Sequence, residues 1–254
     1  MLDECAKIRI DVLRMVFASR EGHLPSAFSI VETLYAVYAN KHEHDVFFLS
    51  KGHAGAALFA TLAHFGILEK QELLSYCAYD SRLGGHPHRT VPGVMNSSGS
   101  LWHGFPVAAG YAFSRKIKHE PGEVFCLIGD GESNEGTIWE TAMYAEQLHL
   151  SNFVCIIDKN NSQVRAMTSI HLPAKFESFG WEVREVDGHS VEELKRVLFE
   201  PHEKPLCVIA NTKKGKGVRE LEENFMAWHH KAPGADEYEK FRAEILSQSD
   251  SNAL

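Results

Sequence analysis

Two continuous apolar runs joined by one amphipathic segment restrict the folds open to this chain more than any other feature. The runs are Val124–Ile128 and Phe153–Ile157, and between them the residues from about Glu135 to Leu148 place their apolar side chains on one helical face. Strands that are apolar throughout are typical of parallel sheets buried on both faces, and a strand, helix and strand of this length form a βαβ unit. Three further runs are strand candidates: Val46–Leu49, Glu182–Val186 and Leu206–Ala210. The sequence therefore predicts an α/β doubly wound, mostly parallel sheet with helices on both faces.

The rest of the chain is predicted to be helical or loop-rich. Helices are expected over about Asp3–Arg20, Ser26–Tyr38 and Glu237–Leu246, and Ser190 with Glu193 has the spacing of a capping box before another helix. Residues 81 to 100 form a long loop, which favours a functional role. We expect residues 1–254 to form one domain with a polar C-terminal tail from about residue 234.

Composition excludes several classes of function. The net charge is −8 without a cluster of Lys and Arg, which argues against binding to nucleic acid. There is no apolar run of transmembrane length, and the acidic start at Asp3 and Glu4 does not fit a secretory signal, so we expect a cytoplasmic protein without membrane contact. The five cysteines show no CxxC pairing and do not suggest a disulfide framework.

Polar residues follow both apolar runs directly. Gly129-Asp130-Gly131 ends the first run, and Asn160 lies thirty positions after Asp130, behind the second run. Carboxylate and amide oxygens suit a small divalent cation, and glycine leaves backbone amides free to face an anion. Asp130 and Asn160 together predict a site that holds a diphosphate through a metal. A tight turn followed by a polar loop, with no ligand, could have the same sequence.

Four histidines lie in loops punctuated by glycine and proline: His23, His53, His86 and His229. Imidazole titrates near neutrality, so such side chains can donate to sugar hydroxyls, pair with a phosphate or relay protons. A single loop histidine is more often a surface residue, but four in similar contexts indicate a catalytic group.

The metal and diphosphate pattern resembles the fingerprint of the thiamin diphosphate enzymes, and longer motifs narrow the resemblance to the amino-terminal half or subunit of the transketolase family. These motifs run in the family's order from about Glu21 to Pro233: Phe48-Leu49-Ser50-Lys51-Gly52-His53-Ala54, Gly85-His86-Pro87, Ser98-Gly99-Ser100-Leu101, Gly129-Asp130-Gly131-Glu132, Asp187-Gly188-His189 and Lys214-Gly215-Lys216-Gly217.

The resemblance implies roles for individual residues. Asp130 and Asn160 would supply side-chain oxygens, and Ser162 its backbone carbonyl, to Mg²⁺ or Ca²⁺. Gly131 would offer its amide to the diphosphate, and Glu132 of the same motif would belong to the cofactor-binding residues.

The resemblance assigns the histidines as well. His53 and His229 would lie near the diphosphate and the substrate, while His23 and His86 would contact the ketose oxygens.

The chain departs from the family pattern at two places. Gly99 and Leu101 would line the linkage between the thiazolium and aminopyrimidine rings, but Trp102 stands where the family usually has glycine, and either narrows the pocket or packs beneath the loop. The segment from Ser162 to Arg165 lacks the usual Asp-Gly, which puts its substrate contacts in doubt.

The segment Lys213–Gly217 resembles a phosphate-binding loop only weakly, because it lacks the spacing of a P-loop. Its sequence indicates either a flap over the cofactor or a solvated basic turn.

In this family a glutamate on a second, pyrimidine-binding domain activates the cofactor, and this chain has no room for that domain. Glu135 matches a position near the metal loop and is not a substitute. We therefore expect the N-terminal subunit of a split transketolase that transfers a two-carbon ketol unit from a ketose or ketose phosphate to an aldose acceptor, with a separate C-terminal subunit in an α2β2 assembly and sugar phosphates as substrates. Two alternatives stay open: the α subunit of a 2-oxo acid dehydrogenase or decarboxylase, and a non-catalytic cofactor-binding homologue.

Overall fold

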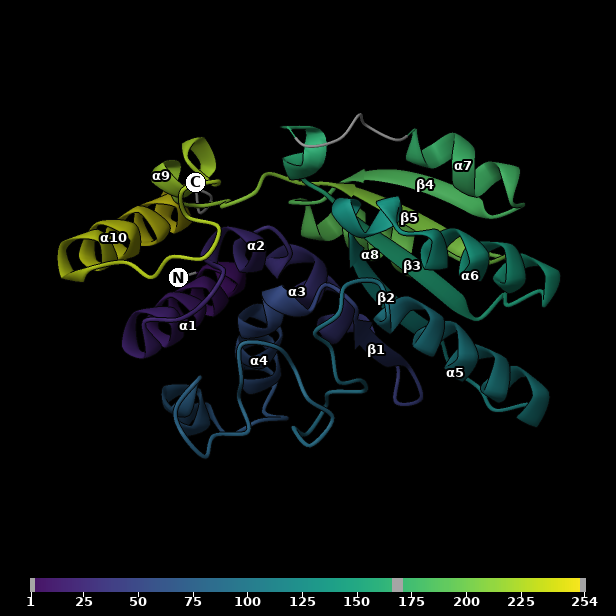
Figure 1. Ribbon diagram of the computed structural model, residues 1–254, viewed down its shortest axis with the longest axis horizontal. Helices are drawn as coiled ribbons and strands as arrows, with labels where there is room; N and C mark the ends of the chain where they lie inside the picture. The colour runs from purple at the N-terminus through teal and green to yellow at the C-terminus, as the bar shows by residue number, and fades with distance from the viewer. Residues whose placement is uncertain (1–2, 166–170, 252–254) are drawn as a thin grey trace.

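A five-stranded parallel sheet forms the centre of the protein. The computed structural model describes residues 3–165 and 171–251. The strands are β1 (Val46–Leu49), β2 (Val124–Gly129), β3 (Phe153–Lys159), β4 (Glu182–Asp187) and β5 (Leu206–Asn211), in the order β1-β2-β3-β5-β4 (Figure 1). All four strand pairs are parallel. The predicted α/β sheet is confirmed, and each predicted strand lies within two residues of the observed one.

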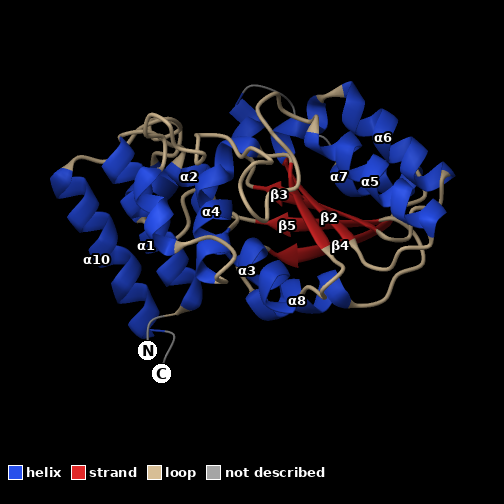
Figure 2. Ribbon diagram, turned by 90° about the horizontal axis from the view of Figure 1, so that it is seen from below, coloured by secondary structure: helices blue, strands red, loops and turns tan. Residues whose placement is uncertain are grey.

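Helices cover both faces of the sheet because alternate residues of the central strands point to opposite sides. Phe125 and Leu127 of β2 pack toward α3 (Val31–Asn40) and α8 (Val191–Phe199). Cys126 and Ile128 point the other way, toward α5 (Gly104–Lys118), α6 (Gly136–Gln147) and α7 (Leu172–Ser178). Figure 2 shows these two helical layers above and below the strands.

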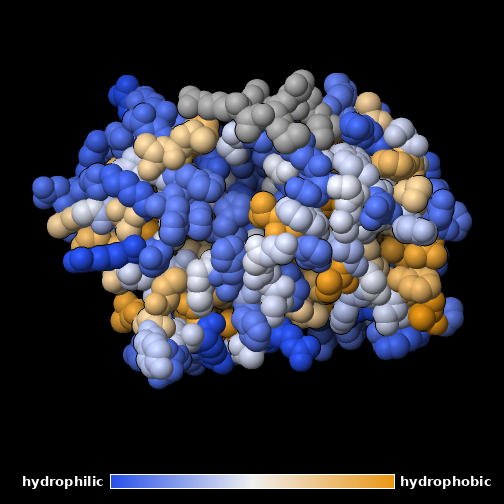
Figure 3. Space-filling model, in the orientation of Figure 1, coloured by the Kyte–Doolittle hydropathy of each residue, from blue (hydrophilic) through white to orange (hydrophobic). Residues whose placement is uncertain are grey.

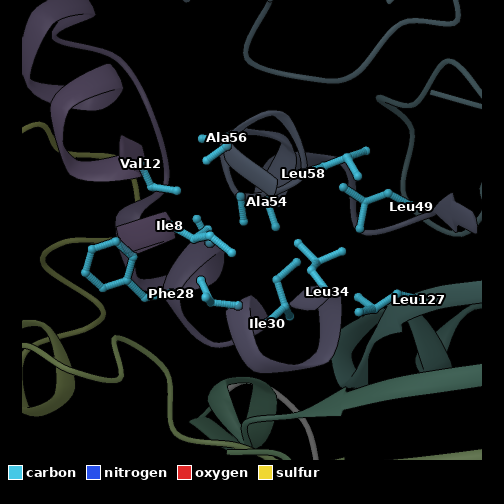
Figure 4. Packing of buried hydrophobic residues seen from close by; sticks show 14 of the residues in the cluster. Ile8, Val12, Phe28, Ile30, Leu34, Leu49, Ala54, Ala56, Leu58 and Leu127 are labelled. Carbon is cyan, nitrogen blue, oxygen red and sulfur yellow. The ribbon is translucent and has the colours of Figure 1, made fainter. Parts of the chain in front are cut away.

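A further group of helices lies to one side of the sheet in both ribbon views. Its members are α1 (Glu4–Ser19), α2 (Leu24–Phe28), α4 (Gly55–His64), α9 (Arg219–Glu223) and α10 (Ala235–Ser251). Ile8 and Val12 of α1 lie near Ala54 and Ala56 at the start of α4, in the same buried group as Leu49 and Leu127 at the ends of β1 and β2 (Figure 4). No helix in residues 3–165 and 171–251 is long and apolar enough to cross a membrane.

Two predicted helices differ from the observed ones. The helix expected over Ser26–Tyr38 is divided into α2 and α3, and Ser29 at the break donates to Asp158 Oδ2 at 2.9 Å. The polar C-terminal segment contains a longer helix than Glu237–Leu246. Its Phe241 and Ile245 are buried in the core, so α10 packs against α1 instead of extending into solvent.

Candidate functional site

The two segments predicted to hold a metal meet at the carboxyl edge of the sheet. Asp130 follows β2 and is only 3% exposed, and its Oδ2 accepts a hydrogen bond of 2.7 Å from the backbone amide of Asn161 after β3. Asn160 Oδ1 lies 3.0 Å from the amide nitrogen of Ser162. Gly131 is exposed, and apart from its chain neighbours no described residue has an atom within 4 Å of where a Cβ would stand, so its backbone can be approached closely.

A buried ion pair that the sequence prediction did not assign lies beneath these residues. Lys51, two residues after the end of β1, forms an ion pair with Asp158 of β3, and their side chains are 2% and 1% exposed. Asp158 also accepts from Asn160 Nδ2 at 2.8 Å and from the hydroxyl of Thr212. A charged residue at the end of an otherwise apolar strand was the signal that could have revealed it, because a buried charge requires a partner.

The charges at this edge suit a cation and an anion together. Burial, reinforced by the neighbouring Asp158, raises the pKa of Asp130 to about 6. Burial, with Lys51 nearby, lowers the pKa of Lys214 to about 8. A divalent cation at Asp130 and an anion at Lys214 would each favour the charged form of the residue. Thiamin diphosphate with a metal has this combination of charges.

The Lys213–Gly217 segment is not a solvated basic turn, and its role as a flap over the cofactor stays a prediction. Lys214 is buried, and its Nζ lies 3.3 Å from Ser162 Oγ. The amide of Gly215 donates to the carbonyl of Pro25 at 3.0 Å. His189 Nε2 accepts from the amide of Lys213 at 2.7 Å. These bonds fix Lys214 beside the predicted metal segment.

The four predicted histidines form one cluster. The ring of His23 lies 5.5 Å from that of His53, 6.5 Å from that of His86 and 5.3 Å from that of His229, between ring centroids. The rings of His53 and His229 are 6.2 Å apart. His230 was not predicted, and it stacks on His23 at 4.6 Å.

The cluster is held in the neutral form. Burial, reinforced by the neighbouring histidines, lowers the pKa of His23 to about 4. Burial together with the nearby Lys51 lowers the pKa of His53 to about 2. Burial also lowers the pKa of His86 and of His229. Neutral imidazoles both donate and accept hydrogen bonds, which suits the recognition of sugar hydroxyls.

Several buried polar atoms near the histidine cluster have no hydrogen-bond partner among the residues that the structure describes. They include His23 Nδ1, Ser26 Oγ and Ser98 Oγ. Ser98 lies beside His86, because a Cβ on Gly52 would meet both side chains. Buried polar groups are normally hydrogen-bonded, so unpaired ones at the wall of a site fit a bound polar ligand.

Glu132, expected among the cofactor-binding residues, is bonded within the chain. It is 2% exposed, and its carboxylate accepts from the amide of Gly129 at 2.7 Å, from Ser50 Oγ at 2.7 Å and from the amide of Trp102 at 2.6 Å. This carboxylate ties the ends of β1 and β2 to the segment that leads into α5. A direct contact of Glu132 with the cofactor remains a prediction.

The backbone at Trp102 explains the glycine that the family usually has there. Its φ is 66°, in the left-handed region that glycine adopts without strain. The indole is half-buried and packs against the buried hydrophobic residues between the sheet and α5. The two alternatives for its effect, narrowing of the pocket and packing beneath the loop, stay predictions. Gly99 and Leu101, predicted to line the cofactor linkage, are exposed just before this residue.

The described residues contain no group of three or more His, Cys, Asp and Glu side chains placed to hold a metal. The predicted ligand set has one carboxylate, one amide oxygen and one backbone carbonyl, and therefore belongs to a different class of site.

Residues 4–249 match the family described as "Transketolase, thiamine diphosphate binding domain". The chain is 38% identical over 246 residues to a protein of Actinobacillus succinogenes that is named as one subunit of apulose-4-phosphate transketolase, with coverage of 89% of this chain and 88% of that protein. It is 32% identical to the protein of the same name from Phocaeicola vulgatus, with 94% and 91% coverage. Human transketolase is 33% identical over 98% of this chain, which spans 42% of the longer protein.

A solved structure gives the same result for the fold. The transketolase of Campylobacter jejuni superimposes with a TM-score of 0.85 at 26% identity, covering 95% of this chain and 42% of that one.

Proposed function

The chain belongs to the family of transketolase thiamine diphosphate-binding domains, and on this premise we propose that it is the diphosphate-binding subunit of a transketolase built from two different chains. The observation that carries the proposal is the meeting of Asp130, Asn160 and Lys214 with a histidine cluster at one edge of the sheet. The reaction is the transfer of a two-carbon ketol unit from a ketose phosphate to an aldose acceptor.

The residues at the sheet edge would hold the cofactor. Asp130, Asn160 and the carbonyl of Ser162 would bind Mg²⁺, while the amide of Gly131 and the ammonium group of Lys214 would face the diphosphate. When bound, thiamin diphosphate supplies a nucleophilic carbon and an electron sink for breaking and forming the C–C bond. Asp158, which is paired with Lys51, accepts from Asn160 Nδ2 and so holds the side chain of Asn160 in place.

The histidines would bind and orient the sugar. His23 and His86 would contact ketose oxygens, and His53 and His229 would lie between the sugar and the diphosphate. Because the pKa of His23 is lowered to about 4, its unpaired Nδ1 can accept a hydroxyl proton or donate its own, according to the tautomer. Imidazoles that are uncharged before substrate binds can exchange a proton with a sugar hydroxyl.

A partner chain would complete the enzyme. It would provide the pyrimidine-binding domain and the activating glutamate, in an α2β2 assembly located in the cytoplasm. The names of two relatives support this arrangement, since the chain covers 88% and 91% of proteins that are each named as one transketolase subunit. The name of those two relatives makes apulose 4-phosphate the first donor to test.

Thermal unfolding tests the binding half of the proposal. At 100 times Kd, thiamin diphosphate with Mg²⁺ should stabilise the chain by about 2.7 kcal/mol by mass action. Asp130→Ala should abolish that stabilisation, and Asp236→Ala, an exposed carboxylate on α10, should keep it. An unshifted wild type, even with the partner present, would contradict cofactor binding and would support a degenerate homologue that neither binds the cofactor nor catalyses the reaction.

Turnover tests the reaction. The complex with its companion chain should transfer a ketol unit from apulose 4-phosphate or another ketose phosphate to an aldose. Turnover of 2-oxo acids without activity on phosphosugars would favour the 2-oxo acid dehydrogenase alternative. Full ketol transfer by the isolated chain would contradict the two-chain arrangement.

A further inference from the structure

A buried ion pair joins α1 to α3 and takes no part in the chemistry proposed so far. Nη2 of Arg9 donates to both carboxylate oxygens of Glu32, at 2.6 and 2.7 Å, and to the carbonyl of Phe28 at 3.2 Å. The two paired side chains are 6% and 8% exposed. Burial alone would raise the pKa of Glu32, but Arg9 and His189 hold it below its usual range. Glu32 is therefore an ionised carboxylate inside the protein, and His189 is its second partner.

His189 connects this ion pair to the segment that carries Lys214. Its Nδ1 lies 3.1 Å from Glu32 Oε2, and its Nε2 accepts from the amide of Lys213 at 2.7 Å. Because a backbone amide can only donate, Nε2 carries no proton, and the proton on Nδ1 is donated to the carboxylate. The amide of His189 itself donates to Asp187 Oδ1 at 2.9 Å, and its side chain is 12% exposed. The tautomer and the orientation of the ring are both fixed.

The ion pair also contacts the other end of the same segment. A Cβ on Gly217 would lie 3.3 Å from Arg9 Cδ and 3.4 Å from Arg9 Nε. The φ of Gly217 is 95°, in a region that favours glycine. We call Arg9, Glu32 and His189 the Arg9–His189 network. It contacts the first and the last residue of Lys213–Gly217, and Lys214 lies between them.

Two contacts of the Lys214 ammonium group are with neutral groups. Lys214 is buried, and its Nζ lies 3.3 Å from Ser162 Oγ and 5.7 Å from the centre of the Phe225 ring. A buried ammonium group is stabilised when an anion joins it. The segment runs from β5 to α9 (Figure 1), and Figure 3 shows mostly hydrophilic residues over that region. This surface suits a charged ligand.

We propose that His189 is the residue that positions Lys214 for the diphosphate, through the bond between its Nε2 and the amide of Lys213. Glu32 holds the ring in the orientation that this bond requires. His189 is a positioning residue, because it acts through the backbone of the segment and not by contact with the cofactor. This inference rests on the proposed function, which places the diphosphate at Lys214.

Two conservative variants separate the two bonds of the ring. Glutamine at position 189 places its Oε1 near the position of Nε2 and can accept from the amide of Lys213. Asparagine places its amide near Nδ1 and can donate to Glu32, but it is too short to reach Lys213. In calorimetric titrations of the full-length chain with thiamin diphosphate and Mg²⁺, His189→Gln should bind as the wild type does. His189→Asn should weaken binding by about 5- to 10-fold, approaching the loss expected for Lys214→Met.

A double-mutant cycle distinguishes positioning from a general role in folding. If His189 acts through Lys214, then His189→Asn/Lys214→Met should bind no more weakly than Lys214→Met alone, because the two substitutions remove one contact. His202 provides the matched control at the amino edge of the sheet. Its side chain is 5% exposed, and its Nδ1 lies 2.8 Å from the carbonyl of Lys204. His202→Asn should keep the wild-type affinity even where it lowers the unfolding temperature.

Amide hydrogen exchange tests the bond without the cofactor. Loss of one hydrogen bond should speed exchange of the Lys213 amide by about 5-fold or more in His189→Asn. His189→Gln should keep the amide protected as in the wild type. This measurement does not depend on the proposed function.

Three results would overturn the inference and leave the proposed function intact. They are wild-type affinity in His189→Asn, equal losses of affinity in His189→Asn and His189→Gln, and losses that add in the double variant. Failure of the wild type to bind thiamin diphosphate, alone and with its companion, would overturn the proposed function and the inference together, even if the Lys213 amide responds as expected.

Discussion

Replacement of Lys51 by methionine should destabilise the protein strongly. Lys51 and Asp158 are 2% and 1% exposed, and Lys51 also donates to the carbonyl of Ser26 at 2.9 Å. Methionine would leave the Asp158 carboxylate buried without its countercharge, and breaking a buried pair in this way costs about 3–5 kcal/mol. The exposed pair of Arg82 and Glu72, at 40% and 30% exposure, is the control, and Arg82→Met should cost less than about 1 kcal/mol.

The pH dependence of the stability lost in Lys51→Met distinguishes the cost of an unpaired, buried Asp158 carboxylate from the cost of lost packing. Burial alone would raise the pKa of Asp158, but Lys51, with the hydroxyls of Thr212 and Ser29, holds it below its usual range. In the wild type this carboxylate is ionised in both the folded and unfolded states between pH 8 and 5, and it contributes no pH dependence there. In Lys51→Met burial dominates, so the pKa in the folded state rises above the unfolded value.

The variant should therefore recover stability as the pH falls, because its folded state takes up a proton that the unfolded chain does not bind. Urea unfolding at pH 8 and pH 5 measures the difference in unfolding free energy between wild type and variant at each pH. We expect a smaller difference at pH 5, and Lys51→Met/Asp158→Asn should recover part of the loss at pH 8. A difference that is below 1 kcal/mol or independent of pH would refute the role assigned to the pair.

Three further predictions concern the same edge of the sheet. Trp102→Gly should be more stable than Trp102→Ala by about 1 kcal/mol, because both lose the indole but only glycine adopts a φ of 66° freely; equal urea midpoints would contradict this. The pKa of His53 is lowered to about 2 in the folded protein. Below about pH 6.5 the folded state therefore binds fewer protons than the unfolded state. The free energy of unfolding should fall by up to about 2 kcal/mol between pH 6.5 and 5. His53→Gln should remove that part of the slope in urea titrations. Lys214→Met should weaken thiamin diphosphate binding about 10-fold in calorimetry through the lost charge-assisted contact, whereas Lys216→Met, a half-buried control, should bind normally.

The sheet could be predicted because buried parallel strands are apolar throughout, and the runs at Val124 and Phe153 have that composition. Two long helices were missed for physical reasons. In α4, residues 55–63 are all buried, so the segment has no polar face and no helical period to detect. In α5, two glycines and Pro106 lower the intrinsic helix propensity, and the contact of Gly104 with Ser50 compensates only in the folded protein.

The site could be predicted where its residues lie within short motifs. Asp130, Asn160 and the histidines carry recognisable local sequences, and their convergence at the carboxyl edge follows from the parallel sheet. The pairing of Lys51 with Asp158 joins residues 107 positions apart. The stacking of His230 on His23 likewise depends on how distant loops pack. Contacts of this kind arise from tertiary packing. The local sequence can indicate that a buried charge needs a partner, but it does not identify the partner.

The three bonds of Glu132 bear on how sequence variation in such proteins should be interpreted. A substitution there would displace Gly129, Ser50 and Trp102 together, so cofactor binding would fail whether or not the carboxylate touches the cofactor. A screen of variants would therefore identify Glu132 as a cofactor ligand in both cases, whether it contacts the cofactor or only positions these three residues. The residues that it joins form one structural unit, and across relatives we expect them to change as a set instead of drifting independently.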